Sequence, residues 1–585
     1  MLMEQQRRRL DVWVTSVVAT VVIAIGAAAP HATAQTLAWD PSPDASVAGY
    51  RVRYGASAAA LEASVDVGGR FELPLRWWPR DRPWFFCVEA YNASFTRSRC
   101  SDVVVLTPNV DEPGGGAIET YAQWVARLAP GAESADPDDD GVTNANEFIA
   151  RTDPFVPNRW LFAEGATGAF REEIALANPT SDSALVRLRF LREGADAVET
   201  VAALGPASRA TVVVNDVPGL GATSAGVELI GTYGAVVAER TMTWTAPGGS
   251  RPSHTAKAVA APSSEWYFAE GEARLTDTWF LVANAGTSAT SVTFEFMTDL
   301  GARVVRTYTV GPQARFTVWA NAIAELAGNS FATTVRATQP VIAERAVYFW
   351  SGTSGWRGGH VSAGATAPAQ RWFVAEGRTG PFFDTYVLIG NPGASAVTAT
   401  LRYLTQAGLS RTDVVTIGAR SRLTIPVDHL KGLEDTDVSV DVSTSGPVIV
   451  ERSMYWPGDA SSWREGHNSV ALAELGTRWV LADGRWRDSA AAESYLLLAN
   501  PGNLTAVAKV RVLREYGRPP LSVDVYLPPS SRQTIRIDDS VGLQAGERFS
   551  LDVTSTQPIA VERSMYTSVG GTWTSGSNET GTRIK

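Results

Sequence analysis

Apolar and polar side chains alternate along many short segments of this chain, most clearly beyond residue 159. In one such segment Val186, Leu188 and Phe190 fall on one side, and Arg187 and Arg189 fall on the other. Successive side chains of a β-strand point to opposite faces of a sheet, so this period of two predicts half-buried strands. Glycine, proline and asparagine separate the segments, as is typical of antiparallel strands joined by turns. We therefore expect a mainly β protein built from antiparallel two-sheet sandwiches.

The last three-quarters of the chain repeats one unit four times. The motif Trp-x-x-Ala-(Glu/Asp)-Gly begins at four tryptophans about 106 residues apart: Trp160, Trp266, Trp372 and Trp479. A Glu-Arg dipeptide recurs in step with it, at Glu239, Glu344, Glu451 and Glu562. The predicted sandwich repeats span 159–265, 266–371, 372–478 and 479–585, and we expect them to lie in series as separate blocks. A closed propeller of eight blades is the alternative, and the missing half-period disfavours it.

The Glu-Arg dipeptide predicts a buried ion pair in each repeat. Arg452 shares its strand face with Val450, Met454 and Trp456, an apolar setting for a guanidinium. A buried charge without a partner is costly, so a carboxylate should lie nearby. The acid of the tryptophan motif is the natural partner, which predicts four structural pairs: Glu164–Arg240, Glu270–Arg345, Glu376–Arg452 and Asp483–Arg563. A ligand groove lined by these residues is the disfavoured alternative, because four identical sites would bring further invariant polar groups.

Residues 1–34 have the pattern of an export signal peptide. Three arginines at 7–9 precede an apolar stretch at 12–29, and Ala32-Thr33-Ala34 offers a cleavage site. An uncleaved membrane anchor is the alternative, since the stretch approaches spanning length. After cleavage no apolar run of membrane length remains, which predicts a secreted or cell-surface protein without a membrane span. The net charge of −10 comes without any basic run, so nucleic acid is not an expected partner.

Residues 36–107 predict a separate module of short strands. The two cysteines of the chain, Cys87 and Cys100, flank a turn in this module, so a disulfide is expected in an exported protein, with two unrelated thiols as the alternative. The module resembles a fibronectin type III domain in Leu37-Ala38-Trp39-Asp40-Pro41, Gly49-Tyr50-x-Val52-x-Tyr54 and Val88-Glu89-Ala90-Tyr91-Asn92. That resemblance implies an immunoglobulin-like sandwich that acts as a binding or spacer module. The pair Trp77-Trp78 fits an exposed sugar platform or, more readily, edge packing.

A linker at 108–116 leads into residues 117–157, which predict a short helix and a calcium loop. Apolar residues at helical spacing mark the helix, at 118–128. The loop fits D-x-D-x-[DN]-G-x5-E, which predicts six calcium ligands: Asp136, Asp138, Asp140, Val142, Asn144 and Glu147. Its carboxylates would repel one another if unfilled, so calcium is favoured over a solvated acidic loop. The segment resembles the thrombospondin type 3-like calcium linkers of exported bacterial proteins, and also dockerins, which carry two such loops. The resemblance implies an EF-hand-like, calcium-stiffened joint.

Two further sets of side chains recur near the ends of the repeats. The histidines His254, His360 and His467 are expected to be loop residues with one hydrogen bond each, because no second His or Cys at metal-ligand spacing accompanies them. The tryptophans Trp356, Trp463 and Trp573 fit glycan stacking and packing against a neighbouring repeat equally well.

The functional prediction rests mainly on the repetition. The repeats resemble an uncharacterised family found in tandem on exported bacterial proteins, in the motifs Trp266-Tyr-Phe-Ala-Glu-Gly and Glu451-Arg-Ser-Met-Tyr-Trp. This resemblance implies an exported protein with a modular architecture, and it implies no particular activity. No Gly-x-Ser-x-Gly, His-Glu-x-x-His or phosphate-binding glycine loop occurs, so no enzyme is expected. We expect a structural and adhesion protein whose tandem copies give multivalency, with an extracellular glycan or another surface protein as partner. A carbohydrate-binding accessory protein acting beside extracellular hydrolases is the alternative.

Overall fold

The computed structural model describes residues 22–23, 36–42, 44, 47–55, 57–61, 63–68, 72–74, 83–92, 97–106, 134–136, 144 and 156–584, the last range without 182, 193, 234, 248, 351–354, 458–462, 489–490, 516–517 and 570. Strands dominate these residues, which confirms the mainly β fold class. Short 3₁₀ turns join some of them, at Val214–Asp216, Ala320–Ala322, Ala324–Leu326, Val427–His429 and Asp539–Val541. None of the helices in the described ranges is long and apolar enough to cross a membrane. The predicted helix at 118–128 and the pair Trp77-Trp78 lie outside the described residues.

The N-terminal domain consists of two small antiparallel sheets. One has the order β1-β2-β5 and the other the order β4-β3-β6-β7. Their strands are β1 (Val22–Ile23), β2 (Thr36–Ala38), β3 (Val47–Gly55), β4 (Ala63–Gly68), β5 (Glu72–Pro74), β6 (Trp84–Asn92) and β7 (Val104–Leu106). Strand β1 falls within the predicted export signal. Trp39, Tyr54 and Phe86 are buried between the sheets, and Cys87 of β6 forms a disulfide with Cys100, with 5.6 Å between the Cα atoms.

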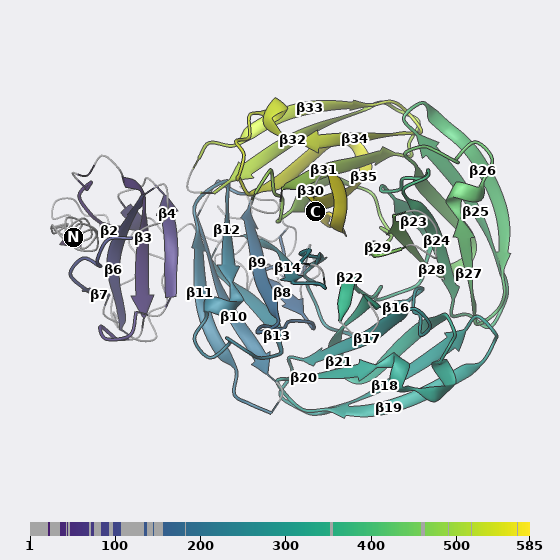
Figure 1. Cartoon of the computed structure of the whole chain (residues 1–585), viewed down its shortest axis with the longest axis horizontal. Helices are drawn as coiled ribbons and strands as arrows, with labels where there is room; N and C mark the ends of the chain where they lie inside the picture. The colour runs from purple at the N-terminus through teal and green to yellow at the C-terminus, as the bar shows by residue number, and fades with distance from the viewer. Residues whose placement is uncertain are drawn as a thin grey trace, which may run out of the picture.

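Each repeat is a pair of four-stranded antiparallel sheets, and repeat 2 shows the plan. Its strands are β16 (Ser263–Phe268), β17 (Thr276–Asn284), β18 (Thr290–Thr298), β19 (Arg303–Val310), β20 (Ala314–Trp319), β21 (Phe331–Trp350) and β22 (Trp356–Ala363). The first half of the long strand β21 lies in a sheet of order β19-β18-β21-β16, and its second half lies in a sheet of order β20-β17-β21-β22. Strands β18 and β19 lie at the rim of the molecule, whereas β22 lies near its centre (Figure 1).

The other repeats follow the same plan. Repeat 1 comprises β8 (Arg159–Phe162), β9 (Phe170–Asn178), β10 (Ala184–Arg192), β11 (Val198–Leu204), β12 (Ser208–Val213), β13 (Ala225–Tyr233), β14 (Val237–Trp244) and β15 (Ser253–Lys257), so its long strand is split into β13 and β14. Repeat 3 comprises β23 (Ala369–Val374), β24 (Asp384–Asn391), β25 (Val397–Thr405), β26 (Gly408–Ile417), β27 (Ser421–Pro426), β28 (Ser439–Trp456) and β29 (Glu465–Val470). Repeat 4 comprises β30 (Gly476–Leu481), β31 (Ala492–Asn500), β32 (Ala506–Arg514), β33 (Leu521–Leu527), β34 (Ser531–Ile537), β35 (Phe549–Val569), β36 (Thr572–Thr580) and β37 (Thr582–Arg583).

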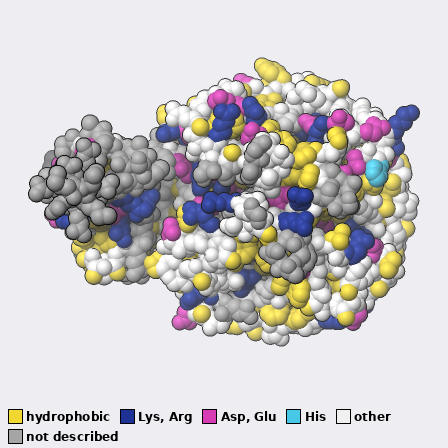
Figure 2. Space-filling model, viewed as in Figure 1, with side chains coloured by type: hydrophobic (Ala, Val, Ile, Leu, Met, Phe, Trp, Pro, Cys, Tyr) yellow, Lys and Arg dark blue, Asp and Glu magenta, His cyan; other side chains and the backbone are white. Residues whose placement is uncertain are grey.

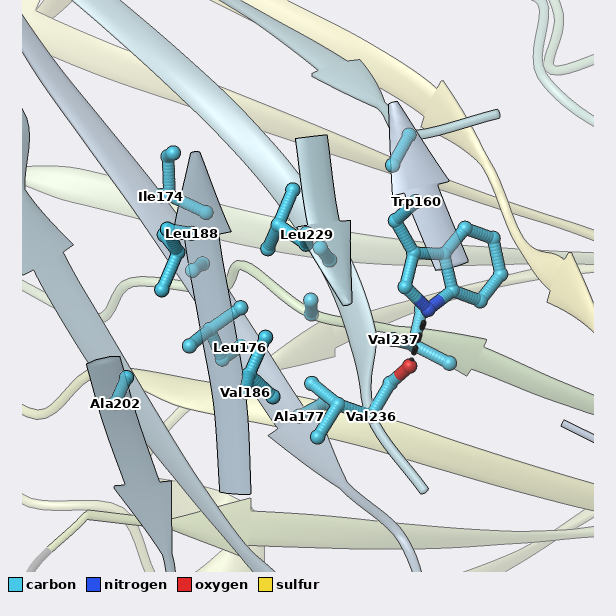
Figure 3. Packing of buried hydrophobic residues seen from close by; sticks show 14 of the residues in the cluster. Trp160, Ile174, Leu176, Ala177, Val186, Leu188, Ala202, Leu229, Val236 and Val237 are labelled. Carbon is cyan, nitrogen blue, oxygen red and sulfur yellow. Dashed lines mark hydrogen bonds between the residues drawn. The ribbon is translucent and has the colours of Figure 1, made fainter. Parts of the chain in front are cut away.

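The tryptophan of the repeated motif is buried where the long strand passes from one sheet to the other. In repeat 2 the Trp266 indole N–H donates to the carbonyl of Val341 at 2.9 Å. The same bond recurs from Trp372 to Val448 and from Trp479 to Ile559. In repeat 1 the Trp160 indole points at the carbonyl of Val236 beside the apolar core (Figure 3). A large apolar ring with one satisfied donor therefore fixes the crossover in every copy.

The asparagine that ends strands β17, β24 and β31 also has a structural role. Asn284 is fully buried, and its side-chain amide donates to the carbonyls of Ser288 and Gly311, both at 2.8 Å. Its side-chain oxygen accepts the N–H of Gly286 at 2.9 Å. The same bonding pattern recurs at Asn391 and Asn500. One buried amide thus ties two turns together, which explains why asparagine recurs there.

The four repeats close into a ring rather than lying in series (Figure 1). The strands β15, β22, β29 and β36 pack side by side around the centre, and β36 of repeat 4 contacts β15 of repeat 1. Strand β12 of repeat 1 also forms a parallel bridge with β32 of repeat 4, at Ser208 and Arg514. The expectation of separate blocks in series is therefore wrong. The repeats keep individual cores, but the cores of repeats 1, 3 and 4 each include buried residues of one neighbouring repeat.

Candidate functional site

The Glu-Arg dipeptides lie at the joints between repeats. Glu344 of repeat 2 lies 3.0 Å from Arg240 of repeat 1, Glu451 lies 2.9 Å from Arg345, and Glu562 lies 3.1 Å from Arg452. Glu239 of repeat 1 pairs with Arg563 of repeat 4, which completes the circle. Neighbouring strand residues point to opposite faces, so each glutamate faces the preceding repeat while its arginine faces the following one. All eight side chains are buried.

The predicted pairing of these arginines with the acids of the tryptophan motif has a mixed outcome. Glu164 lies 2.8 Å from Arg240, and Glu270 lies 3.0 Å from Arg345. Arg452 instead bonds His467 at 2.6 Å and Ser469 at 3.0 Å, and its ion pairs among the described residues do not include Glu376. Arg563 donates to the backbone carbonyl of Asp483 and not to its carboxylate. Direct pairing with the predicted carboxylate is thus found in repeats 1 and 2.

The pKa values of two of these acids follow the difference in pairing. Burial would raise the pKa of Glu270, but His360 and Arg345 outweigh it and hold the pKa at about 2. Burial raises the pKa of Glu376 to about 7, because Arg452 and Arg532 offset burial only in part. Glu270 is therefore ionised at neutral pH, whereas Glu376 titrates near it.

The glutamates also bind the backbone of the tryptophan motif in the preceding repeat. Glu451 accepts the N–H of Ala269 at 2.9 Å and that of Glu270 at 3.2 Å. Glu562 does the same with Ala375 and Glu376, and Glu239 with Ala482 and Asp483. A single carboxylate thereby satisfies two buried peptide groups and a guanidinium from the neighbouring copy.

Tyrosines complete three of the joints. The hydroxyl of Tyr348 donates to Glu164 at 3.0 Å, that of Tyr455 donates to Glu270, and that of Tyr566 lies 3.4 Å from Glu376. Repeat 1 has Thr243 at the corresponding place, and Thr241 donates instead to Asp483 of repeat 4 at 2.9 Å. The joint between repeats 4 and 1 is therefore chemically distinct from the other three.

The recurring histidines lie on central strands and not in loops, so their predicted placement is wrong. His254 of β15 lies 3.1 Å from the hydroxyl of Tyr348, and His467 of β29 lies 3.1 Å from that of Tyr566. Burial lowers the pKa of both histidines well below the usual value, and nearby arginines lower it further. They are neutral parts of the joints. Among the described residues no group of three or more His, Cys, Asp or Glu side chains has the arrangement of a metal site.

The recurring tryptophans pack within the ring. Trp356 stacks on Tyr348 with 4.2 Å between ring centroids, Trp463 stacks on Tyr455 at 4.5 Å, and Trp573 stacks on Tyr566 at 4.7 Å. The carbonyl of Trp356 also accepts the indole N–H of Trp244 in repeat 1 at 3.2 Å. These rings therefore support the joints, and all three remain partly exposed.

A carboxyl group also lies at the centre of the ring. Glu465 of β29 is 1% exposed, and it accepts the N–H of Gly359 of β22 at 3.0 Å. A Cβ on Gly358 would lie 1.3 Å from the same carboxyl group, so the side chain occupies the space that this glycine leaves. Burial raises the pKa of Glu465 well above its usual value, despite bonds to Ser575 and to peptide groups. The group contributes a buried, hydrogen-bonded carboxyl whose charged form is disfavoured by burial.

We expect Glu465→Gln to stabilise the protein at pH 8 and to leave its stability unchanged near pH 4. The folded state holds the Glu465 proton more tightly than the unfolded chain, so wild type loses stability as the pH rises above the unfolded pKa of about 4.3. Glutamine keeps an acceptor for Gly359 and does not ionise. Urea denaturation of both proteins across this pH range measures the effect, with the exposed Glu325→Gln as control. Parallel stability curves for Glu465→Gln and wild type would contradict it.

Little of the predicted calcium loop is described. Of the six predicted ligands, Asp136 and Asn144 are described. The N–H of Asn144 donates to the carbonyl of Ala135 at 2.8 Å. That bond brings the ninth position of the predicted loop beside the residue that precedes the first. Four predicted ligands lie outside the described residues: Asp138, Asp140, Val142 and Glu147.

The N-terminal domain packs on repeat 1. Leu185 and Val201, from β10 and β11, belong to the same buried cluster as the core of that domain. Tyr54 of the domain and Thr200 of β11 line one cavity at the same boundary. The domain and the ring therefore share an apolar contact.

Comparisons with known proteins give distant likenesses. No family model and no curated protein matches the sequence. Among solved structures the chain is similar to Thermotoga maritima 1070, with 18% identity over 19% of this chain and 95% of that chain and a TM-score of 0.17. It is also similar to a tetra-tandem repeat in the extending region of a large adhesion protein, with 13% identity, 70% and 94% coverage and a TM-score of 0.09. A third is the Bacteroides ovatus mixed-linkage glucan utilization protein SGBP-B in complex with a heptasaccharide, with 10% identity, 71% and 92% coverage and a TM-score of 0.10. At these scores the likenesses carry no argument about function.

Proposed function

We propose that this chain is an exported, non-enzymatic binding protein of the adhesion class, which displays a closed ring of four repeats beside a fibronectin type III-like domain. One observation carries the proposal: the acids, arginines and tyrosines shared by the repeats are engaged with one another at the joints. Residues that hold a scaffold together are not available to a reaction. The disulfide supports export, because such bonds persist in oxidising compartments.

A retention assay tests this function. The mature protein, starting after residue 34, is incubated with bacterial cell walls, insoluble polysaccharides and an array of soluble glycans, with and without calcium. Saturable retention on one class of surface, without turnover of the bound material, supports the proposal. Conversion of any of these materials, or no retention on any of them, contradicts it.

Calcium binding at residues 136–147 belongs to the same proposal. The donor set is made of carboxylate, amide and carbonyl oxygens, which suit a hard cation. The bond from the Asn144 N–H to the Ala135 carbonyl supports a chain reversal between these two residues. Bound calcium would stiffen the connection between the N-terminal domain and the ring by pulling the carboxylates together.

Calcium should bind this loop with a Kd of about 10⁻⁴–10⁻³ M, the range of extracellular modules. We expect Asp136→Asn to weaken binding at least tenfold, because it removes a charge from the first ligand position. Isothermal titration with calcium measures the affinity, and limited proteolysis of residues 108–157 measures the stiffening. Asp196→Asn, an exposed acid in a hairpin of repeat 1, is the matched control. Equal affinity in Asp136→Asn and wild type would contradict the site.

A carbohydrate-binding accessory protein is the second candidate, and an exposed tryptophan favours it. Trp319 is 42% exposed and stacks on Trp279 with 5.4 Å between centroids. Its indole N–H lies 3.3 Å from Asp277. A flat aromatic surface with polar groups at its edge suits the stacking of a sugar ring. Loss of polysaccharide retention in Trp319→Ala, but not in the exposed Tyr526→Ala, would favour this candidate.

A further inference from the structure

A cavity of about 610 Å³ lies where the N-terminal domain meets repeats 1 and 4. Its size is within the range of small-molecule sites, about 300–1,000 Å³. Six arginines line it: Arg51, Arg53, Arg97, Arg171, Arg209 and Arg548. Three acids line it as well: Glu173, Asp216 and Glu515. The lining thus has a formal excess of positive charge in a protein whose net charge is −10.

The acids at this cavity are shared among several arginines. Glu173 lies 2.8 Å from Arg171, 2.9 Å from Arg485 and 3.1 Å from Arg548. One carboxylate therefore faces three guanidinium groups, of which Arg485 also lies 3.2 Å from Asp483. Arg209 pairs with Glu515 and lies 3.5 Å from Asp483. The surplus leaves a positive potential that an added anion would relieve.

Two of the charged residues at this cavity have no counterpart of the same kind in the other repeats. Counted back from the asparagine that ends its strand, the position of Glu173 is occupied in the other repeats by Trp279, Tyr386 and Tyr495. The position of Arg548 opposite the tryptophan-motif loop is occupied by Ser224, Ser330 and Asp437. The other repeats therefore have aromatic residues, serine or aspartate at these places. The charges at the joint of repeats 4 and 1 are an addition to the scaffold.

The N-terminal domain supplies the other wall of the cavity. Arg51 and Arg53 lie on β3, and Arg97 lies beside β6 with an exposed side chain. Basic side chains are visible on both sides of the boundary between this domain and the ring (Figure 2). Arginines from two domains thus converge on one space, and a ligand there would contact both.

We propose that this cavity binds an acidic saccharide, through oxyanion groups held by the arginines of both walls. The planar guanidinium fork pairs with carboxylate, sulfate or phosphate oxygens through two parallel hydrogen bonds. The volume and the two-sided distribution of arginines suit a ligand with several rings and charges better than a single free ion. The inference rests on the proposed binding function and names the class of ligand.

Titration of the mature full-length protein with trigalacturonic acid tests the proposal, at low and at moderate salt. Wild type should bind it, should not bind the neutral maltotriose, and should bind more weakly as salt rises. Arg97→Ala/Arg171→Ala, which changes two partly exposed groups, should weaken binding at least tenfold. Arg303→Ala/Arg306→Ala removes two exposed arginines from repeat 2 and should leave the affinity unchanged.

Three results would overturn the assignment: no binding of trigalacturonic acid, equal affinity in the cavity variant and wild type, or binding of inorganic phosphate or sulfate alone. Retention on cell walls or neutral polysaccharides by a protein that fails these tests would leave the binding function in place and remove only the cavity. The two failures are therefore distinguishable.

Discussion

Replacing Arg345 with methionine should lower the free energy of unfolding by about 3–5 kcal/mol, the cost of breaking a buried ion pair by removing one partner. The guanidinium is fully buried and lies 3.0 Å from Glu270 and 2.9 Å from Glu451. It also bonds Ser362 and Asn468. Methionine fills much of the volume but leaves two carboxylates buried without their cation. Chemical denaturation monitored by tryptophan fluorescence measures the loss.

Two further variants separate charge from packing at Arg345. Arg306→Met removes an exposed arginine that pairs with Glu325 and should leave the stability unchanged. Adding Glu451→Gln to Arg345→Met should restore part of the stability, because it removes one stranded charge and keeps an acceptor for the N–H groups of Ala269 and Glu270. If Arg345→Met and Arg306→Met behaved alike, the buried network would not hold the joint.

Glu239→Ala should cost as much as Arg345→Met, about 3–5 kcal/mol, although Glu239 and its partner Arg563 are separated by 324 residues. Its carboxylate accepts the N–H of Ala482 at 2.9 Å and that of Asp483 at 3.2 Å. Alanine leaves these buried N–H donors without their acceptor and the Arg563 guanidinium without its carboxylate partner. The effect should be visible in repeat 4, as faster hydrogen exchange of the amides of 482 and 483.

Glu344→Ala is the matched variant at the joint of repeats 1 and 2. A closed ring predicts similar losses of stability for Glu239→Ala and Glu344→Ala, because each glutamate fills the same role at a different joint. A chain of blocks in series predicts that Glu239→Ala leaves the amides of repeat 4 unaffected. Unchanged exchange at 482 and 483 would therefore contradict ring closure.

The sequence predicted the unit but not its assembly. Alternation and the recurring turns indicated the strands, and the repeated tryptophan and arginine indicated buried groups in each copy. The apolar side chains on the same strand face as Arg452 correctly indicated that a carboxylate lies nearby, but Glu562 of the next repeat supplies this carboxylate. The repetition of the glutamate in all four dipeptides was a signal for a shared role. The arginine that pairs with each glutamate lies one repeat away. The alternation of apolar and polar residues along a strand does not encode a contact between repeats.

Ring closure depends on the rotation between neighbouring repeats, because four such rotations must add up to a full turn. Those rotations follow from the packing of side chains such as Trp244 against Tyr348, and not from the order of apolar residues along one strand. The missing half-period disfavoured a propeller of eight blades, yet the repeats form a ring, and repeat 2 shows that one unit contains two four-stranded sheets. The prediction of loop histidines is wrong, because His254, His360 and His467 lie on strands β15, β22 and β29.

The most direct test of the ring is a covalent bond between its two ends. The side-chain oxygens of Thr255 in repeat 1 and Ser577 in repeat 4 lie 3.1 Å apart, on adjacent strands β15 and β36. The variant Thr255→Cys/Ser577→Cys should oxidise to an intramolecular disulfide at any protein concentration, seen as faster migration in non-reducing electrophoresis and confirmed by peptide mass. Two thiols that stay free, or that bond only between molecules, would show that repeats 1 and 4 do not meet.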